Sequence, residues 1–402
     1  MNIRDDAEVH PTGRDPRTLR AVVGGRVLVD GTLRPADLVI DDGRIAGIAE
    51  QGASRDGSDV LDATGAIVAP GFVDLQCNGA GGTDLTAAIA DDPAAIDRVA
   101  RVLPRFGVTS FLPTVVTSPG PVRSAAVAAM RTRRSTTDGG VAATPLGLHF
   151  EGPLISLDHL GAHTARFVTV PDDEEIDAWI HSEVVSLVTL APEVDDALQI
   201  VRQLSDTRTV VSAGHTAMSP EVFGHARDAG LGYVTHLFNA MAPFGHRRPG
   251  PVGAVLADDG VTVGLICDGL HVDPTAIRMA WRTLGPHRTS LVSDAAAPLG
   301  GPHGTFRLGS LDVVYDDSGV RTVDGVLAGS ALALDQAVRN LVAFTGCSLV
   351  DALATVTTTP ADLLGITDRG RVAVGNHADL TIVDAGGALV ATVIGGHVAW
   401  RS

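Results

Sequence analysis

Residues 210–236 read VVSAGHTAMSPEVFGHARDAGLGYVTH, and this stretch decides the fold class. The apolar run Val210–Ala213 is typical of a buried strand, and a loop that contains His215 follows it. Pro220–Ala229 has the pattern of a helix, and Tyr233–His236 that of a second strand. A strand, a helix and a further strand in this order predict a unit of two parallel strands joined by a helix.

The same alternation extends from about residue 66 to residue 370. Eight strands, each followed by a helix or a long loop, predict a (β/α)8 TIM-like barrel, with an open doubly wound sheet as the alternative. The predicted strands are Ile67–Gln76, Thr109–Thr114, Leu146–Phe150, Ser186–Ala191, Val210–Ala213, Tyr233–His236, Val261–Ile266 and Ser290–Ser293. The predicted helices include Ala94–Phe106, Val122–Arg133, Asp195–Leu204, Pro220–Ala229 and Pro274–Leu284.

Both ends of the chain carry short apolar runs separated by tight turns. Ala21–Val29 near the beginning and Leu389–Ile394 near the end are examples of such strand-like runs. We therefore expect one small β domain assembled from residues 1–66 and 370–402, flanking a barrel over residues 67–369.

The composition is that of an ordinary globular protein, with 45% hydrophobic and 19% charged residues. A formal net charge of −17 argues against nucleic acid and anionic membranes as general partners. Met1–Pro16 carries acids and prolines where a signal peptide needs an apolar stretch, and no run is long enough to cross a bilayer. Three scattered cysteines without a CxxC pattern argue against a disulfide framework. We expect a cytoplasmic protein.

The chain contains no lysine, so all 30 of its basic residues are arginines. This excludes Schiff-base chemistry, a phosphate-binding P-loop and a lysine carbamate that bridges two metal ions. A GC-rich genome is the ordinary explanation of the bias, and the exclusion holds whatever its cause.

Polar residues stand at the ends of several predicted strands. Catalytic groups of such barrels lie at the carboxyl ends of the strands and in the loops that follow. Because these ends converge on one face of a barrel, we expect the side chains to lie close together. They are Gln76 and Asn78 after the first strand, Glu151 after the third, His215 after the fifth, His236 after the sixth and Asp294 after the eighth.

Glu151, His215 and His236 offer one oxygen and two nitrogens, a set that catalytic zinc sites use with a position left open for water. The alternative is that each histidine is a hydrogen-bonded packing residue. Convergence of all three at strand ends favours a metal site. Zn²⁺ is expected, and the same donors accept Fe²⁺, Mn²⁺ or Co²⁺.

Two further residues are candidates for the chemistry. Asp294 is a candidate proton shuttle, which would take a proton from water and give it to the leaving amine. Its alternative role is a helix N-cap. His163 lies in a loop with Gly161 that follows Glu151, and it can donate a hydrogen bond to a carbonyl oxygen. The alternative for His163 is a solvated loop histidine.

An anion site is predicted beside His236. Asn239 and Ala240 can present amide donors, and Arg247 in a glycine-rich loop can bind a phosphate in bidentate fashion. His271 lies on the same face of the barrel. A solvated surface pair of Arg247 and its neighbour Arg248 is the alternative.

Motifs along almost the whole chain resemble those of the N-acetylglucosamine-6-phosphate deacetylases of the amidohydrolase superfamily. Each motif alone is loose, but their order along the chain is specific. They are Pro70-Gly71-Phe72-Val73-Asp74, Glu151-Gly152-Pro153, Leu190-Ala191-Pro192-Glu193, Ser212-Ala213-Gly214-His215, Thr235-His236-Leu237-Phe238-Asn239-Ala240-Met241, Asp268-Gly269-Leu270-His271-Val272-Asp273, Ser293-Asp294-Ala295 and Leu327-Ala328-Gly329-Ser330.

The resemblance implies a barrel with a β-sandwich domain built from both chain ends. It also implies a homodimer that hydrolyses N-acetylglucosamine 6-phosphate, an amino-sugar phosphate, to glucosamine 6-phosphate and acetate. The implied roles are metal ligands for Glu151, His215 and His236, acid/base catalysis for Asp294 and polarisation of the acetyl carbonyl for His163. Asn239, Ala240 and Arg247 would bind the phosphate, with His271 contributed across the subunit interface.

Many superfamily members carry a His-x-His pair after the first strand, which binds a second metal ion. Here these positions read Gln76-Cys77-Asn78, and an amide oxygen is a poor zinc ligand beside imidazole. We therefore expect one tightly bound metal ion per chain, with Gln76 and Asn78 as vestiges of a second-metal site.

Three alternatives stay open. One is a deacetylase of another N-acetylhexosamine phosphate, such as N-acetylgalactosamine 6-phosphate. The second is a cyclic-amide hydrolase, against which the missing lysine and His-x-His pair argue. The third is a non-catalytic assembly protein with the amidohydrolase fold, which should have lost the ligands that this chain retains.

Overall fold

The computed structural model describes residues 18–52, 57–133 and 142–402. The segment Met1–Pro16, on which the expectation about a signal peptide rests, lies outside the described residues. No described helix is long and apolar enough to cross a membrane.

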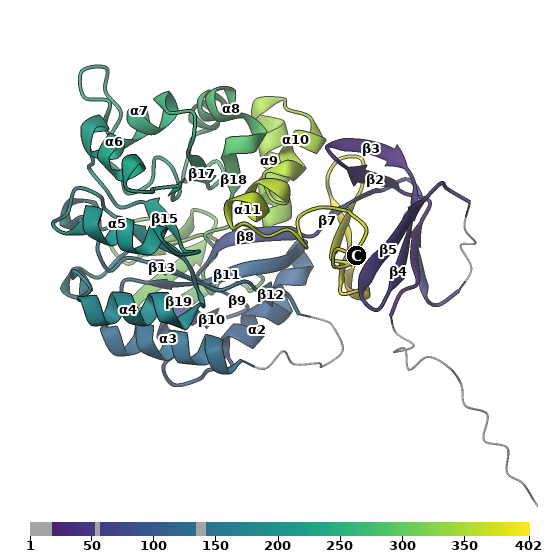
Figure 1. Cartoon of the computed structure of the whole chain (residues 1–402), viewed down its shortest axis with the longest axis horizontal. Coiled ribbons are helices and arrows are strands. Elements are labelled where there is room, and N and C mark those ends of the chain that lie inside the picture. The colour runs from purple at the N-terminus through teal and green to yellow at the C-terminus, as the bar shows by residue number, and fades with distance from the viewer. Residues whose placement is uncertain (1–17, 53–56, 134–141) are drawn as a thin grey trace, which may run out of the picture.

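A barrel of eight parallel strands forms the body of the molecule (Figure 1). Each strand pairs with the next, and a parallel bridge between Cys77 and Ala295 joins the first strand to the segment after the last. The predicted barrel is confirmed, and the open sheet was the wrong alternative. The strands are β8 (Phe72–Cys77), β11 (Val108–Val116), β13 (Leu148–Glu151), β14 (Val185–Leu190), β15 (Val210–Ala213), β16 (Tyr233–Val234), β17 (Thr262–Leu265) and β18 (Thr289–Leu291).

Helices cover the outside of the barrel (Figure 1). All five predicted helices are present, and Ser219 caps one of them by accepting a hydrogen bond from the backbone N–H of Val222. They are α2 (Ala95–Val102), α3 (Gly120–Thr132), α5 (Ala197–Ser205), α6 (Pro220–Asp228) and α8 (Pro274–Arg288). Further helices are α1 (Leu85–Ala88), α4 (Asp173–Ser182), α7 (Gly250–Ala257), α9 (Leu334–Thr345), α10 (Leu349–Ala354) and α11 (Thr358–Leu363).

The first predicted strand, Ile67–Gln76, is divided in the structure. A Cβ atom at Gly71 would lie 2.1 Å from Oγ1 of Thr109, so only glycine lets the chain pass this close to β11. Before this glycine, β7 (Ile67–Pro70) pairs outside the barrel. After it, β8 enters the barrel.

Two sheets lie outside the barrel, one built from the beginning of the described chain and the other from both its beginning and its end (Figure 1). They share one apolar cluster that includes Val22, Leu38, Val68, Leu380 and Val393. The four-stranded sheet has the order β5 (Arg44–Ala49), β4 (Asp37–Asp41), β1 (Ala21–Val23), β6 (Val60–Asp62). The six-stranded sheet has the order β24 (His397–Arg401), β23 (Leu389–Ile394), β22 (Leu380–Val383), β7, β2 (Arg26–Val29), β3 (Thr32–Pro35).

The division into residues 1–66, 67–369 and 370–402 stays a prediction. The strand β7 continues the six-stranded sheet beyond residue 66, to Pro70.

A three-stranded antiparallel sheet follows the last barrel strand and was not predicted. It consists of β19 (Gly304–Leu308), β20 (Leu311–Asp316) and β21 (Gly319–Thr322). Its apolar side packs in a small cluster that includes Leu308, Val313, Val320 and Val116, the last residue of β11. The sheet therefore lies at the carboxyl end of the barrel strands, where a barrel carries its functional residues.

Candidate active site

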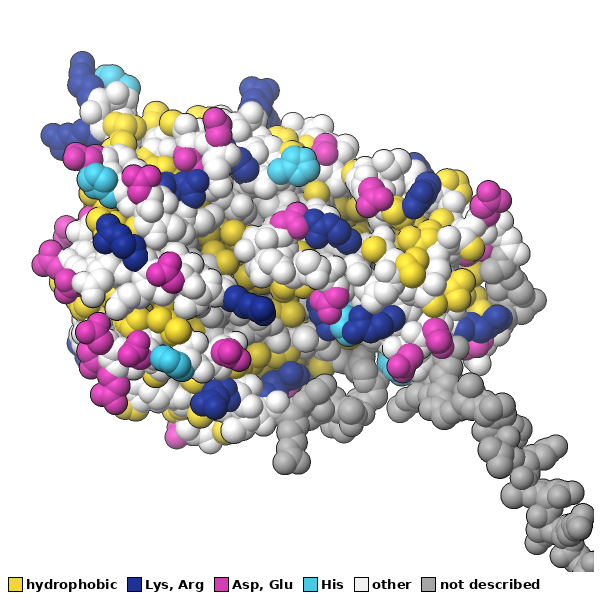
Figure 2. Space-filling model, in the orientation of Figure 1, with side chains coloured by type: hydrophobic (Ala, Val, Ile, Leu, Met, Phe, Trp, Pro, Cys, Tyr) yellow, Lys and Arg dark blue, Asp and Glu magenta, His cyan; other side chains and the backbone are white. Residues whose placement is uncertain are grey.

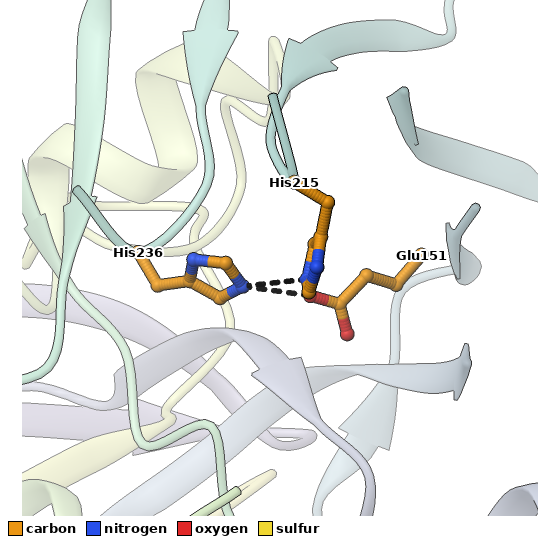
Figure 3. A group of neighbouring side chains, drawn as sticks. All are labelled: Glu151, His215 and His236. Carbon is orange, nitrogen blue, oxygen red and sulfur yellow. Dashed lines mark hydrogen bonds and ion pairs between the residues drawn. The ribbon is translucent and has the colours of Figure 1, made fainter. Parts of the chain in front are cut away.

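Glu151, His215 and His236 converge at the carboxyl end of the barrel (Figure 3). Glu151 ends β13, and the two histidines follow β15 and β16. Oε1 of Glu151 lies 3.1 Å from Nε2 of His215 and 2.8 Å from Nε2 of His236, and the two nitrogens are 3.2 Å apart. All three side chains are buried. Three potential ligand atoms meeting at one point fit a single divalent metal ion.

Neighbouring groups orient the ligands. Nδ1 of His215 donates a hydrogen bond to the backbone oxygen of His159 at 3.0 Å, which leaves the Nε2 lone pair directed at the cluster. Both histidines have positive φ angles, 50° for His215 and 31° for His236, an unfavourable conformation that clusters at functional sites. At Gly214, a Cβ would lie 2.6 Å from Cγ2 of Thr189, so the chain before His215 needs glycine.

The protonation states of His215 and Glu151 are those that a metal ligand needs. Burial lowers the pKa of His215 to about 4, which keeps the imidazole neutral. Burial alone would raise the pKa of Glu151, but hydrogen bonds from His163, His215 and His236 hold it well below its usual value. Burial alone would lower the pKa of His236, but its hydrogen bond to Glu151 and the negative charge of that carboxylate raise it. A neutral imidazole and an ionised carboxylate are the forms that coordinate a metal ion.

Asp294 lies beside this cluster, after β18. It is buried and accepts a hydrogen bond from Nδ2 of Asn78 at 2.7 Å. Burial, and then the negative charge of Glu151, raises the pKa of Asp294 to about 6. A carboxyl group with such a pKa can both accept and return a proton near neutral pH. The alternative of a helix N-cap was wrong, because β19 and not a helix is the next described element.

His163 also lies in the cluster and is not a solvated loop residue. Its ring centroid is 4.3 Å from that of His215, and only 9% of the residue is exposed. Oγ1 of Thr117 lies 2.7 Å from Nδ1, and the backbone N–H of Thr117 donates to the same nitrogen at 3.4 Å. With Nδ1 as an acceptor, the proton is on Nε2. Nε2 lies 3.7 Å from Oε2 of Glu151, so this N–H faces the predicted reaction centre.

These residues line one cavity of about 190 Å³. The cavity brings together most of the predicted site, including three residues predicted to bind the sugar phosphate. Its lining is Asn78, Val116, Glu151, Gly161, Ala162, His163, His215, His236, Asn239, Ala240, His271, Asp294, Leu308, Val326, Leu327 and Gly329.

The chain matches the Amidohydrolase family over residues 67–399. The N-acetylglucosamine-6-phosphate deacetylase of Bacillus subtilis is 33% identical over 90% of this chain and 92% of its own length. The Homo sapiens protein of the same name is 35% identical over 94% of each chain. The chain belongs to the N-acetylglucosamine-6-phosphate deacetylase family of amidohydrolases.

Solved structures of this deacetylase family have the same fold. The Pasteurella multocida deacetylase aligns with a TM-score of 0.88 at 29% identity, over 95% of this chain and 99% of its own. A mutant of the Mycobacterium smegmatis deacetylase, solved in complex with N-acetyl-D-glucosamine-6-phosphate, aligns with a TM-score of 0.86 at 32% identity. It covers 95% of this chain and 99% of its own.

Two of the predicted substrate-binding residues, His271 and Arg247, lie in different positions relative to the cavity. His271 lines the cavity of its own chain, where Oδ2 of Asp268 accepts from its Nδ1 at 2.6 Å. The loop after β17 turns this side chain into the cavity of its own chain, and the expectation that a neighbouring subunit contributes His271 stays a prediction. Arg247 is exposed and does not line the cavity, and the same holds for Arg248.

The two predicted second-metal positions, Gln76 within β8 and Asn78 directly after it, differ from each other. Asn78 lines the cavity and binds Asp294, so it contributes to the site in its own right. Gln76 is 1% exposed and does not line the cavity, and neither of its amide atoms has a hydrogen-bond partner within the described chain.

Sequence reasoning missed several residues of the site. Thr117 orients His163 and follows β11 directly, so the strand-end rule would have found it had the predicted strand continued past Thr114. Asp74 accepts a hydrogen bond from the backbone N–H of Ser293, the residue before Asp294. It lies in the motif Pro70-Gly71-Phe72-Val73-Asp74, which indicated the family but no role for Asp74. Leu308 lines the cavity from the unpredicted sheet, and no local pattern indicates its role.

Proposed function

We propose that this chain hydrolyses N-acetyl-D-glucosamine 6-phosphate to D-glucosamine 6-phosphate and acetate in the cytoplasm, with one divalent metal ion, Zn²⁺, per subunit. The observation that carries the proposal is the convergence of Glu151, His215 and His236 beside Asp294 in one buried cavity. Membership of the deacetylase family supplies the substrate.

Glu151, His215 and His236 would hold the metal ion, which supplies Lewis acidity at the carbonyl and lowers the pKa of a water molecule. Asp294 takes a proton from the attacking water. It then returns the proton to the sugar nitrogen as the amide C–N bond breaks, which makes the amine a viable leaving group. The N–H at Nε2 of His163 donates to the acetyl oxygen as negative charge develops there.

The remaining lining residues bind the sugar phosphate. Asn239 and Ala240 offer polar groups beside His236, and His271 reaches the sugar from the loop after β17. None of the three carries the permanent positive charge that a phosphate favours. We assign this charge to Arg247, which lies on an exposed loop outside its own cavity and would enter the cavity of a second subunit in a homodimer.

Acetate release tests the proposal. N-Acetylglucosamine 6-phosphate, its unphosphorylated form and N-acetylgalactosamine 6-phosphate are compared before chelation, after it and after metal is added back. Chelator-sensitive turnover of the first substrate, at a higher kcat/KM than the other two, is expected. Turnover of none of them with metal restored would contradict the proposal, and preference for the galactosamine would redirect it.

Metal content is a separate measurement. Elemental analysis of the purified protein should find one tightly bound ion per chain, because Asn78 already binds Asp294 and Gln76 does not line the cavity. Two tightly bound ions per chain would contradict the single-metal site.

A further inference from the structure

The cavity that contains the candidate active site has one apolar side. Val116, Ala162 and Leu308 line it there and belong to one apolar cluster, while Val326 and Leu327 are further apolar lining residues outside this cluster. Val116 is 6% exposed and Leu308 is 4% exposed. Both side chains are therefore packed against other residues over nearly all of their surface, and the cavity is the open space that they line. An apolar surface of this kind favours an apolar substituent of the substrate over a hydroxyl or a phosphate.

Val116 lies beside the predicted reaction centre. It is the register partner of Glu151 in the parallel pair of β11 and β13, and partners in such a pair project to the same face. The next residue, Thr117, orients His163. The apolar surface therefore adjoins the side chains that would bind the carbonyl group of the amide.

The order of strands places Val116 away from the sugar side of the cavity. β11 is the second strand around the barrel and β16 the sixth, so they lie on opposite sides of a ring of eight. Asn239 and Ala240 follow β16, and His271 follows β17. With the sugar phosphate on that side and Asp294 at the amide nitrogen, the remaining substituent of the carbonyl carbon points toward Val116.

Leu308 is held against Val116 by the turn between β19 and β20. The backbone N–H of Gly309 donates to Oδ1 of Asp84 at 3.0 Å, and Gly309 has a φ of 55°. A Cβ on Gly309 would lie 3.3 Å from Cγ2 of Val116. This turn therefore fixes the distance between the unpredicted sheet and β11, and with it the width of the apolar side of the cavity.

We propose that Val116 and Leu308 form an acyl-selecting surface, which determines the N-acyl group that this chain removes. The inference rests on the proposed deacetylase function and deepens it. The methyl group of an acetamide packs against the two side chains, and each further methylene of a propionamide or butyramide meets them. One methylene in a hydrophobic pocket typically changes kcat/KM by about 10–200-fold.

The test compares N-acetyl, N-propionyl and N-butyryl glucosamine 6-phosphate as substrates of the metal-loaded protein. We expect Val116→Ala and Leu308→Ala each to raise the ratio of kcat/KM for propionyl over acetyl substrate by about tenfold or more. Val116→Ile should lower the same ratio, because it adds a methylene on the same surface.

Val313→Ala is the matched control. Val313 belongs to the same apolar cluster and is fully buried, but it does not line the cavity. Its truncation should leave the ratio unchanged while lowering stability by a similar amount. An unchanged ratio in Val116→Ala and Leu308→Ala, with acetate still released, would overturn the acyl-selecting surface alone. No acetate release by the unmodified protein would overturn the proposed function together with it.

Discussion

The backbone of Asp294 has an unfavourable positive φ of 46°, and this conformation directs its side chain into the cavity. The preceding residue, Ser293, is held by Asp74, whose carboxylate accepts from both the hydroxyl and the backbone N–H of Ser293. From the other side, the hydroxyl of Ser330 donates to the backbone oxygen of Ser293. Because Asp74, Ser293 and Ser330 are buried, the position of Asp294 is determined before a substrate arrives.

Asp294→Asn is expected to lower kcat by about 10²–10⁴-fold, because an amide can neither accept nor return the proton. The substitution keeps the shape of the side chain and spares the predicted ligands Glu151, His215 and His236. Elemental analysis should therefore find the same metal content as in the unmodified protein. Loss of the metal from Asp294→Asn would show instead that this residue is part of the metal site.

Ser293→Ala tests the positioning role of the serine. The substitution removes the hydroxyl that binds Asp74 while leaving Asp294 itself unchanged. We expect kcat to fall about tenfold with KM within about twofold, because the lost positioning acts on the reacting bond and not on sugar binding. Ser186→Ala is the control, since its hydroxyl donates to the backbone oxygen of Leu146, at the opposite end of the barrel. Equal effects of the two substitutions would contradict the positioning role.

Among the secondary-structure elements, Asp84 connects helix α1 to the three-stranded sheet. Its Oδ1 accepts from the backbone N–H of Ala87 at 2.6 Å, which caps α1, and from that of Gly309 at 3.0 Å. Its Oδ2 is buried without a hydrogen-bond partner in the described parts of the chain. Burial raises the pKa of Asp84 to about 6.

Asp84→Asn is expected to stabilise the fold at neutral pH, because Oδ1 keeps both hydrogen bonds and the buried charge is removed. The folded chain binds the Asp84 proton more tightly than the unfolded chain, so this residue costs stability as pH rises from about 4 to 6. The gain should be about 1–3 kcal/mol at pH 8 and shrink toward pH 4, measured as the free energy of unfolding. A gain independent of pH would contradict this origin.

The barrel could be predicted because its strands are buried on both faces and therefore appear as continuous apolar runs. The convergence of the candidate metal ligands could be predicted because they stand at the carboxyl ends of such strands, as Glu151 does at the end of β13. The sheet β19–β21 could not be predicted, because it is half exposed and its strands alternate weakly. The position of His163 depends on how the loop between two short 3-10 helices, Leu157–His159 and Ala165–Phe167, folds back over the cavity, which the sequence around it does not specify.

At the scale of the whole molecule, charge is spread rather than concentrated. Figure 2 shows arginine and acidic side chains interspersed over the visible face, with apolar side chains between them. With a net charge of −17, this face offers no extended basic surface to a polyanion. Positive charge at the active site therefore has to come from single residues, of which Arg247 is the candidate.

The proposed homodimer predicts complementation between two variants with different defects, one in substrate binding and one in turnover. Arg247→Ala should raise the KM for the phosphorylated sugar at least tenfold, because the phosphate lies far from the reacting bond. Asp294→Asn should lower kcat by about 10²–10⁴-fold. If Arg247 acts in the cavity of the other subunit, a mixed dimer of the two variants contains one cavity with both native residues.

Coexpression of the two variants with different affinity tags isolates the mixed dimer for the measurement. We expect about half of the native activity per dimer, with a native KM, from its one intact cavity. A mixed dimer with only the high KM of Arg247→Ala would place Arg247 in its own chain's cavity. A monomer in solution would contradict the dimer itself.

The six-stranded sheet has a consequence for the order in which the protein is made. In this sheet β7 lies between β2 and β22, so the two halves of the sheet come from opposite ends of the described chain. At a ribosomal rate of about 5–20 residues per second, β7 waits roughly 15–60 s for its second neighbour. During this time the early strands expose apolar faces and an open edge, which makes them the part of the nascent polypeptide most in need of a chaperone.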